Sequence, residues 1–276
     1  MLATFAVSLV CGLVVAWVVR RRTVVAPPSS PADTEVHARP AWLLALPFIG
    51  LAALAAAMVL GALLILIESS TGVQKWDESV ERWANTSASQ TSTDVLRAIT
   101  HLGDSITIII VSILVSVFVI ATRRNWQVVP FLATVVIGQF LISNLIKWTA
   151  DRARPELDPL AGFSGTSFPS GHTTAAAATY LAIALVLSGY VSRTARSTLI
   201  GAAVGVAVAV GCSRMLPGVH WFTDVIGGLV LGWTWCVMCW RAFTSYRQFH
   251  SLFGYAPWDS HTTSPSPRQG ASSGGS

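Results

Sequence analysis

The sequence predicts an all-α polytopic membrane protein, a bundle of transmembrane helices. The chain is 53% hydrophobic and only 11% charged, with a mean hydropathy of +0.59, whereas soluble domains are about 25% charged. Its apolar residues gather in blocks of about the ~20 residues that a helix needs to cross a bilayer. Its basic residues are divided unequally between the connecting segments, as in membrane proteins. These observations exclude a soluble globular domain.

Seven apolar blocks are the predicted membrane helices, and the sixth is the shortest. They span residues 2–19, 41–67, 105–121, 126–146, 172–190, 198–212 and 224–240. The four cysteines, Cys11, Cys212, Cys236 and Cys239, all lie inside these blocks. The pair at 236 and 239 has the CxxC spacing, but it lacks a second pair of metal ligands. We expect the cysteines to serve packing.

The distribution of charge predicts the orientation. If the segments after the first, third, fifth and seventh blocks lie in the cytoplasm, that side carries 11 basic and 3 acidic residues, and the other side carries 7 basic and 10 acidic residues. Basic residues concentrate on the cytoplasmic side, so the N-terminus is predicted outside and the C-terminus inside a bacterial plasma membrane. The net charge of +5 then reflects this bias and contact with anionic lipids, and no nucleic-acid partner is needed.

The blocks also divide the chain into four parts. Residues 1–22 form an N-terminal transmembrane anchor, because three arginines follow the first block and no charge precedes it, the reverse of a secretory signal. Residues 23–40 form a proline-rich cytoplasmic linker, residues 41–240 a membrane domain, and residues 241–276 a cytoplasmic tail that ends rich in Ser, Gly and Pro.

Three polar clusters fall on the same predicted outer face. They are KWTADRARPE from residue 147, SFPSGHTT from residue 167 and SRMLPGVHWFTD from residue 213. Taken singly, each has a structural explanation: basic side chains snorkel to the interface, and Pro-Ser-Gly forms turns and helix caps. Because ionisable residues at helix mouths are costly in a membrane protein, the three clusters together indicate a functional site.

The residue types in these clusters predict an anion site. Lys147, Arg154 and Arg214 are cations whose donors suit phosphate oxygens. Ser170 and Gly171 stand where the fifth membrane helix begins, so that free backbone N–H groups and the helix dipole would favour the same anion. Glycine there also allows close approach of a phosphate.

The spacing of the histidines predicts a mechanism. His220 and Asp224 are four residues apart, about one helical turn, so the carboxylate can orient the imidazole as a nucleophile. His172 is suited to general acid–base work. The sequence contains no HExxH, calcium-loop or Walker motif, so we expect no metal and no cofactor.

Together these motifs resemble a known signature. Lys147-x6-Arg154-Pro155, Pro169-Ser170-Gly171-His172 and Ser213-Arg214-x5-His220-x3-Asp224 are similar to the three-part signature of the type 2 phosphatidic acid phosphatase family, within the vanadium haloperoxidase superfamily. The resemblance implies a six-helix phosphatase core over about 41–240, with one extra N-terminal helix. It implies that His220 becomes a phosphohistidine, oriented by Asp224, that His172 serves the leaving group, and that the phosphate is held by Lys147, Arg154, Ser170, Gly171 and Arg214.

Several functional alternatives stay open at this stage. A lipid phosphatase or isoprenoid diphosphatase fits a site at headgroup level, and phosphatidic acid, phosphatidylglycerol phosphate and undecaprenyl or decaprenyl diphosphate are not separated by the sequence. A phosphatase of a water-soluble ester and a silent transporter or scaffold with retained motifs are the alternatives, whereas the soluble haloperoxidases differ in having no bilayer helices. Trp76, Val80 and Trp83 follow one another at helical spacing, either in the membrane interface beside the site or in an ordinary amphipathic cap. The oligomeric state is not predicted.

Overall fold

The computed structural model describes residues 41–69, 72–87, 90–155 and 166–252. These residues form eight α-helices and a short 3-10 turn, η1 (His101–Gly103), and no strand occurs among them. The helices are α2 (Ala41–Glu68), α3 (Gly72–Ser87), α4 (Gln90–Thr100), α5 (Ser105–Arg123), α6 (Val128–Ala150), α7 (Gly171–Ser188), α8 (Arg193–Met215) and α9 (Phe222–Leu252). The predicted N-terminal anchor, the linker and most of the tail lie outside the described residues.

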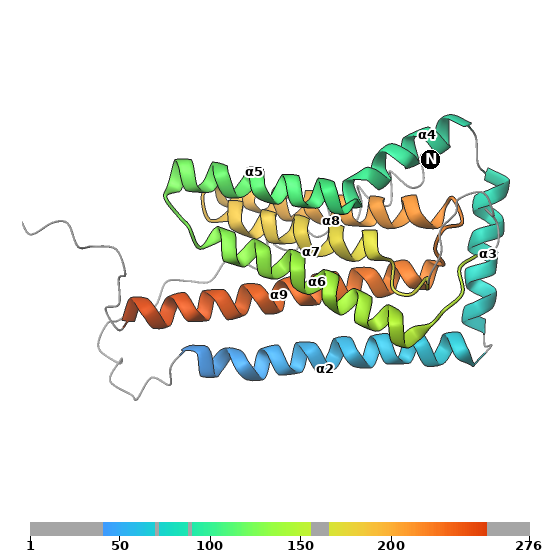
Figure 1. Cartoon of the computed structure of the whole chain (residues 1–276), viewed down its shortest axis with the longest axis horizontal. Coiled ribbons are helices and arrows are strands. Elements are labelled where there is room, and N and C mark those ends of the chain that lie inside the picture. Colours follow the sequence, from blue (N-terminus) through green and yellow to red (C-terminus); the bar gives the residue numbers. More distant parts are fainter. Residues whose placement is uncertain (1–40, 70–71, 88–89, 156–165, 253–276) are drawn as a thin grey trace, which may run out of the picture.

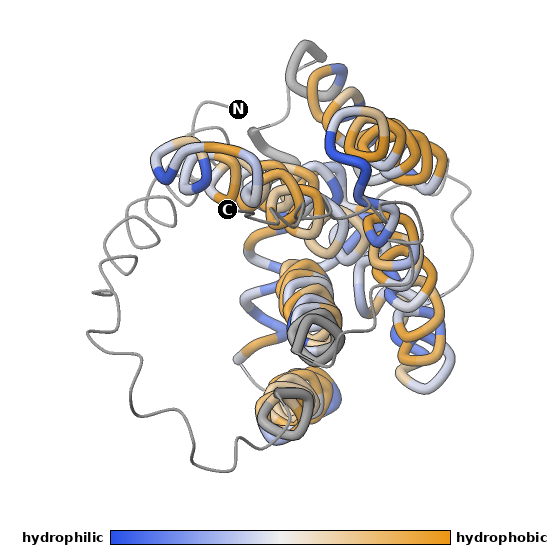
Figure 2. Tube along the Cα trace, turned by 90° about the vertical axis from the view of Figure 1, so that its left-hand side faces the viewer, coloured by the Kyte–Doolittle hydropathy of each residue, from blue (hydrophilic) through white to orange (hydrophobic). Residues whose placement is uncertain are grey.

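Six of these helices, α2 and α5 to α9, are long and apolar enough to cross a membrane. They run along the length of the molecule, whereas α3 lies across one end of the bundle (Figure 1). Figure 2 views the bundle from the opposite end, and most residues along these helices are hydrophobic, with short hydrophilic stretches. The prediction of an all-α membrane bundle is therefore confirmed for the second to seventh apolar blocks.

Helix α7 lies at the centre of the bundle, in contact with α6, α8 and α9. Its first half is rich in alanine and threonine, and small residues let membrane helices approach closely. On α9, a Cβ at Gly228 would lie 2.9 Å from the carbonyl oxygen of Ser170, and one at Gly232 would lie 2.5 Å from that of Thr174. These glycines let the N-terminal parts of α7 and α9 touch, which is where two of the predicted motifs end.

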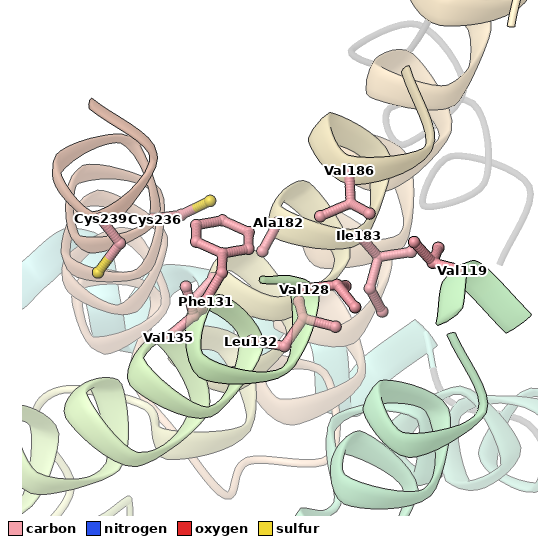
Figure 3. Packing of buried hydrophobic residues seen from close by; sticks show 11 residues of the cluster. Val119, Val128, Phe131, Leu132, Val135, Ala182, Ile183, Val186, Cys236 and Cys239 are labelled. Atoms are coloured by element: carbon pink, nitrogen blue, oxygen red, sulfur yellow. The ribbon is translucent and has the colours of Figure 1, made fainter. Parts of the chain in front are cut away.

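A second packing centre lies toward the other end of the bundle. Phe131 of α6 meets Trp240 and Phe243 of α9 edge-on, with ring centroids 5.6 and 5.4 Å apart. Figure 3 shows Phe131 in one cluster with apolar residues of α5, α6 and α7 and with Cys236 and Cys239 of α9. Both cysteines are buried in this cluster, as expected of residues that serve packing.

The helix boundaries differ from the prediction where polar residues extend a helix. Helix α6 continues beyond residue 146 to Ala150, where Asp151 adopts a left-handed conformation and donates its N–H to the carbonyl of Lys147 at 3.3 Å. Arg154 therefore lies outside the helix, and its distance from Lys147 is not set by helical spacing. The sixth span, α8, begins five residues earlier than predicted, because the hydroxyl of Ser192 accepts the N–H of Ala195 and caps its polar first turn.

Candidate active site

The predicted site residues come together where four helices meet at one end of the bundle. Lys147 lies in the last turn of α6, His172 in the first turn of α7, and Arg214 in the last turn of α8. His220 precedes α9 and Asp224 lies in its first turn. The N–H of Ser170 donates to the carbonyl of Asp224 at 3.0 Å, so the second and third motifs are joined directly through the backbone.

His220 and Asp224 form a buried pair. The Nδ1 atom of His220 lies 3.3 Å from Oδ2 of Asp224, and the two residues are 3% and 0% exposed. On the other side of the ring, Nε2 lies 3.5 Å from a guanidinium nitrogen of Arg154. Because arginine has no acceptor and an ionised carboxylate has no donor, the proton belongs on Nδ1 and the lone pair on Nε2.

The surroundings of His220 keep its imidazole neutral. Burial lowers the pKa of His220 to about 4, and although the carboxylate of Asp224 raises this pKa, the charges of Arg154 and Arg214 lower it. At neutral pH the ring is therefore uncharged. A neutral imidazole with a lone pair fixed on Nε2 has the protonation state that a nucleophile requires.

The three predicted cations line the same region. Lys147 Nζ donates to the carbonyl of Thr166 at 3.3 Å, and its Cε would lie 3.8 Å from a Cβ at Gly171. Arg154 donates to the carbonyl of Val219 at 3.2 Å. Its pKa is lowered by burial, against the opposing charge of Asp224, but an arginine stays charged. Arg214 is buried, and its carbonyl accepts the N–H of His220 at 3.1 Å.

The backbone N–H of Ser170 is not free, contrary to the prediction from the sequence, whereas the place of Ser170 in the phosphate site stays a prediction. Ser170 is the N-cap of α7, as predicted, but its N–H is bonded to Asp224 and is not available to an anion. Its buried hydroxyl oxygen accepts a hydrogen bond from Thr173 at 2.9 Å. The first N–H groups of a helix have no intrahelical partner. The donors at the start of α7 are therefore the N–H groups of Gly171 and the residues after it. The N–H of Ser170 instead links the start of α7 to α9.

His172 has a partner that sequence reasoning missed. Its Nε2 lies 2.8 Å from Oδ1 of Asp104, and Oδ2 of the same carboxylate lies 2.6 Å from Nδ1 of His101. Burial raises the pKa of Asp104, but the hydrogen bonds with His101 and His172 outweigh it, and the pKa lies below its ordinary value. Asp104 is therefore ionised at neutral pH, and each of the two motif histidines faces a carboxylate.

Two further residues near Asp224, Arg152 and Asp77, were not predicted from the sequence. Arg152 donates to Oδ1 of Asp224 at 2.6 Å and to Oδ2 of Asp77 at 2.7 Å. Asp77 belongs to α3 and is 1% exposed, whereas its neighbour Trp76 is 70% exposed. Little in the sequence distinguishes these residues: Asp77 is an acid beside a tryptophan, Arg152 is a second arginine in the string DRARP, and Asp104 is an acid directly before an apolar block.

Comparisons with known proteins agree with this geometry. The family model of the PAP2 superfamily matches residues 127–248 of this chain, from the residue before α6 into α9. Phosphatidylglycerophosphatase B of Bacillus subtilis is 34% identical over 167 residues, 59% of this chain and 81% of that protein. A lipid A 1-phosphatase of Rhizobium etli is 33% identical over 112 residues, 37% of this chain and 44% of that protein, so the match spans less than half of that relative.

The crystal structure of a transmembrane PAP2-type phosphatidylglycerolphosphate phosphatase from Bacillus subtilis is also similar. It is 28% identical in sequence and superimposes with a TM-score of 0.63, covering 70% of this chain and 96% of that one. Six apolar spans lie among the described residues, the motif residues gather at one end of the bundle, and a relative is matched over most of its length. The chain therefore belongs to the PAP2 superfamily and is an integral membrane protein.

Proposed function

We propose that the protein is a phosphatase that hydrolyses a lipid phosphate or isoprenoid diphosphate at the extracytoplasmic face of the membrane, through a phosphohistidine on His220. The observation that carries the proposal is the buried, neutral imidazole of His220, held by Asp224 on one side and facing Arg154 on the other. A phosphate bound by Arg154 brings phosphorus next to the lone pair on Nε2.

The reaction proceeds in two displacements. Nε2 of His220 attacks phosphorus, the bond from phosphorus to the leaving oxygen breaks, and His172 gives a proton to that oxygen. The departing group is an alcohol for a monoester and a monophosphate for a diphosphate. Water then loses a proton to His172 and attacks the phosphohistidine, which releases inorganic phosphate and restores His220. Asp104 holds His172 through both steps.

Phosphate charge is balanced in this proposal by side chains and helix dipole. Lys147, Arg154 and Arg214, with the N–H groups that follow Ser170, supply donors whose positions are fixed before the reaction, and such electrostatic stabilisation is usually the largest contribution to catalysis. We therefore expect hydrolysis to continue in EDTA and to be inhibited by vanadate, which resembles five-coordinate phosphorus. Complete loss with EDTA that Mg²⁺ restores would contradict this assignment.

A lipid substrate is supported by an apolar groove between α2, α6 and α9. The groove has a volume of about 420 Å³ and is lined by small residues of α2, including Ala53, Ala57 and Gly61. At one end it reaches Ile146 and Thr149, which flank Lys147 in α6. An acyl or prenyl chain in this groove would place its phosphate beside the cations. The similar proteins whose names specify a substrate act on phosphatidylglycerophosphate or lipid A.

The direct test is phosphate release by the purified full-length protein in proteoliposomes. The panel contains phosphatidic acid, phosphatidylglycerol phosphate, undecaprenyl diphosphate and glucose 6-phosphate, with His220→Gln as the inactive control. We expect hydrolysis of at least one lipid, together with acid-labile, base-stable label on the wild type after quenching with ³²P-substrate. Hydrolysis of glucose 6-phosphate alone would favour the soluble-ester alternative, and no hydrolysis by the wild type would refute the proposal.

The orientation has its own test. In a chain whose native cysteines are replaced, a cysteine at Asp94 of α4 and one at Thr194 of α8 lie at opposite ends of the bundle, and both positions are exposed. A membrane-impermeant thiol reagent added to intact cells should label the cysteine at position 94 and leave the one at 194 unlabelled. The opposite pattern would place the site in the cytoplasm.

A further inference from the structure

We propose that Arg152 and Asp77 are positioning residues, which hold the carboxylate of Asp224 in the geometry that orients His220. Helix α3, which lies across the end of the bundle (Figure 1), is then part of the active site. The inference rests on the proposed role of His220 as nucleophile. Asp77 lies outside the three motifs from which the site was predicted, and Arg152 occupies an unspecified position within the first of them.

The two oxygens of Asp224 have different partners. Oδ2 faces Nδ1 of His220 at 3.3 Å and accepts the N–H of Trp221 at 2.9 Å. Oδ1 accepts a hydrogen bond from Arg152 at 2.6 Å. With Oδ1 fixed by the guanidinium, the carboxylate cannot turn, so the oxygen that faces His220 stays in place. Arg152 thus acts on the nucleophile through Asp224.

Arg152 is itself held from the other side. Its second terminal nitrogen donates to Oδ2 of Asp77 at 2.7 Å, and the guanidinium lies over the ring of Trp221, 5.4 Å from its centre. The side chains of Arg152 and Asp77 are 11% and 1% exposed. A planar fork can span two carboxylates in this way, whereas the single nitrogen of lysine cannot reproduce the arrangement.

Thr223 closes the network and attaches it to α9. Its N–H donates to Oδ1 of Asp77 at 3.0 Å, and its hydroxyl donates to Oδ2 at 2.7 Å. The same hydroxyl oxygen accepts a hydrogen bond from Arg152 at 2.7 Å. Asp77 therefore sits at the first turn of α9, where a negative charge is favoured by the helix dipole, and it fixes the turn that carries Asp224.

The network predicts different effects for loss of Arg152, which positions Asp224, and for loss of Arg154, which would bind phosphate. Arg152 directs both terminal nitrogens at buried carboxylates, whereas the neighbouring Arg154 faces His220. Replacing Arg152 should therefore slow formation of the phosphohistidine but leave the affinity for a phosphate analogue nearly unchanged. Replacing Arg154 should weaken both. Partners that orient a reacting group commonly contribute ~10–100-fold in activity, and we expect a loss of that size in kcat for Arg152→Lys.

The charge of Arg152 also predicts a change in pH dependence. The groups that face His220 are Asp224, Arg154 and Arg214, and Arg152 balances the charge of Asp224. Without that cation, the charge of Asp224 beside His220 is no longer balanced and holds a proton on the imidazole up to a higher pH, which removes the neutral nucleophile. The acid limb of phosphohistidine formation should therefore move to higher pH in Arg152→Gln and remain where it is in a variant that only loosens packing.

The experiment compares Arg152→Lys, Arg152→Gln and Asp77→Asn with a matched control, Glu78→Gln, on the full-length protein in proteoliposomes. Glu78 is next to Asp77 on α3, but it makes a surface pair with Arg82 at 3.6 Å. Three quantities are measured: the single-turnover rate of ³²P-phosphohistidine formation against pH, kcat and KM, and the inhibition constant of vanadate. The double variant Asp77→Asn/Arg152→Gln tests coupling, since residues of one network are not additive.

We expect a lower kcat and a vanadate constant within about threefold of wild type for all three variants. The acid limb should move to higher pH in Arg152→Gln, which removes the cation, and the double variant should be no worse than Arg152→Gln. The control should match wild type. A vanadate constant that weakens in proportion to kcat would make Arg152 a phosphate ligand, and an unchanged acid limb in Arg152→Gln would make the network structural only. Either result overturns the inference. If Arg152→Gln does not fold, Arg152→Lys and Asp77→Asn decide. A wild type that forms no phosphohistidine would instead refute the proposed function.

Discussion

Replacement of Asp224 by asparagine tests the orientation of the nucleophile most directly. The substitution keeps the size of the side chain and replaces one oxygen by an NH₂ group. Because Asp224 faces Arg152 through Oδ1 and His220 through Oδ2, the amide has two ways to sit, and neither reproduces the carboxylate.

The geometry decides which of the two is adopted. If the NH₂ group faces Arg152, two donors meet in a position where the native contact is 2.6 Å, and an unsatisfied buried donor costs about 1–3 kcal/mol, more when charged. The amide oxygen therefore faces Arg152, and the NH₂ group faces His220. As a donor, the NH₂ group requires a lone pair on Nδ1 of His220. The ring proton therefore moves to Nε2 and removes the lone pair that would attack phosphorus.

The magnitude follows from these two effects. A bias of about 3 kcal/mol toward the wrong tautomer lowers the rate by about 10²-fold, and loss of a charge-assisted hydrogen bond of about 1.5–3 kcal/mol to the developing imidazolium lowers it by a further ~10–100-fold. We expect phosphohistidine formation in Asp224→Asn to fall by about 10³–10⁴-fold, while vanadate still binds because the cations are unchanged.

The assay is a rapid quench with ³²P-labelled lipid phosphate, run beside vanadate inhibition of the residual activity and a thermal unfolding curve. A variant that is folded and forms phosphohistidine at the wild-type rate would show that Asp224 does not set the tautomer. A parallel loss of vanadate affinity would show that Asp224 acts on phosphate binding instead.

Three further predictions concern the other parts of the site. Asp104→Asn and His172→Ala should each slow hydrolysis of a lipid ester more than hydrolysis of p-nitrophenyl phosphate. General acid catalysis contributes ~10²–10⁴-fold and matters most for a poor leaving group. Equal losses on both substrates would contradict a role in protonation. Gly61→Leu should fill the groove, since a Cβ at Gly61 meets nothing within 4 Å. It should raise KM for a long-chain lipid phosphate but not for p-nitrophenyl phosphate. The control Gly50→Leu, at an equally open position outside the groove, should change KM for neither substrate. NMR of ¹⁵N-histidine-labelled protein should show the ring of His220 neutral at pH 5, because burial lowers its pKa to about 4 and it takes up a proton only below that pH; a midpoint near 6.5 would be the contrary result.

Much of the fold was predictable because a bilayer leaves few choices. The second to seventh apolar blocks each became a membrane-spanning helix, since backbone polar groups in lipid must be satisfied within a helix. The polar ends were less predictable. The start of α8 at Arg193 and the end of α6 at Ala150 lie where water can satisfy the backbone, so hydrophobicity no longer marks the boundary.

The site was predictable to the extent that its residues stand out in the sequence. Lys147, His172 and His220 are ionisable groups in an apolar chain, and the predicted topology places their three clusters on one face, which predicted a shared anion site. Asp77 and Asp104 gave no such signal, because each lies in a polar connecting segment where acids are common. Only the packing of α3 against the start of α9, and of η1 against α7, distinguishes them from surface residues.

The sequence by itself determined the membrane spans, the three motifs and the kinds of side chain at the site. These follow from local properties: the apolar length of a segment, the charge of a side chain and a separation of four residues along one helix. Tertiary structure alone decided that the N–H of Ser170 donates to the carbonyl of Asp224. It also decided that Arg152 joins Asp224 to Asp77, which lies 75 positions before Arg152 in the chain. Such contacts depend on how closely α7 and α9 approach and on where α3 crosses the bundle. Those distances are set by the combined packing of many small residues, which no single motif encodes.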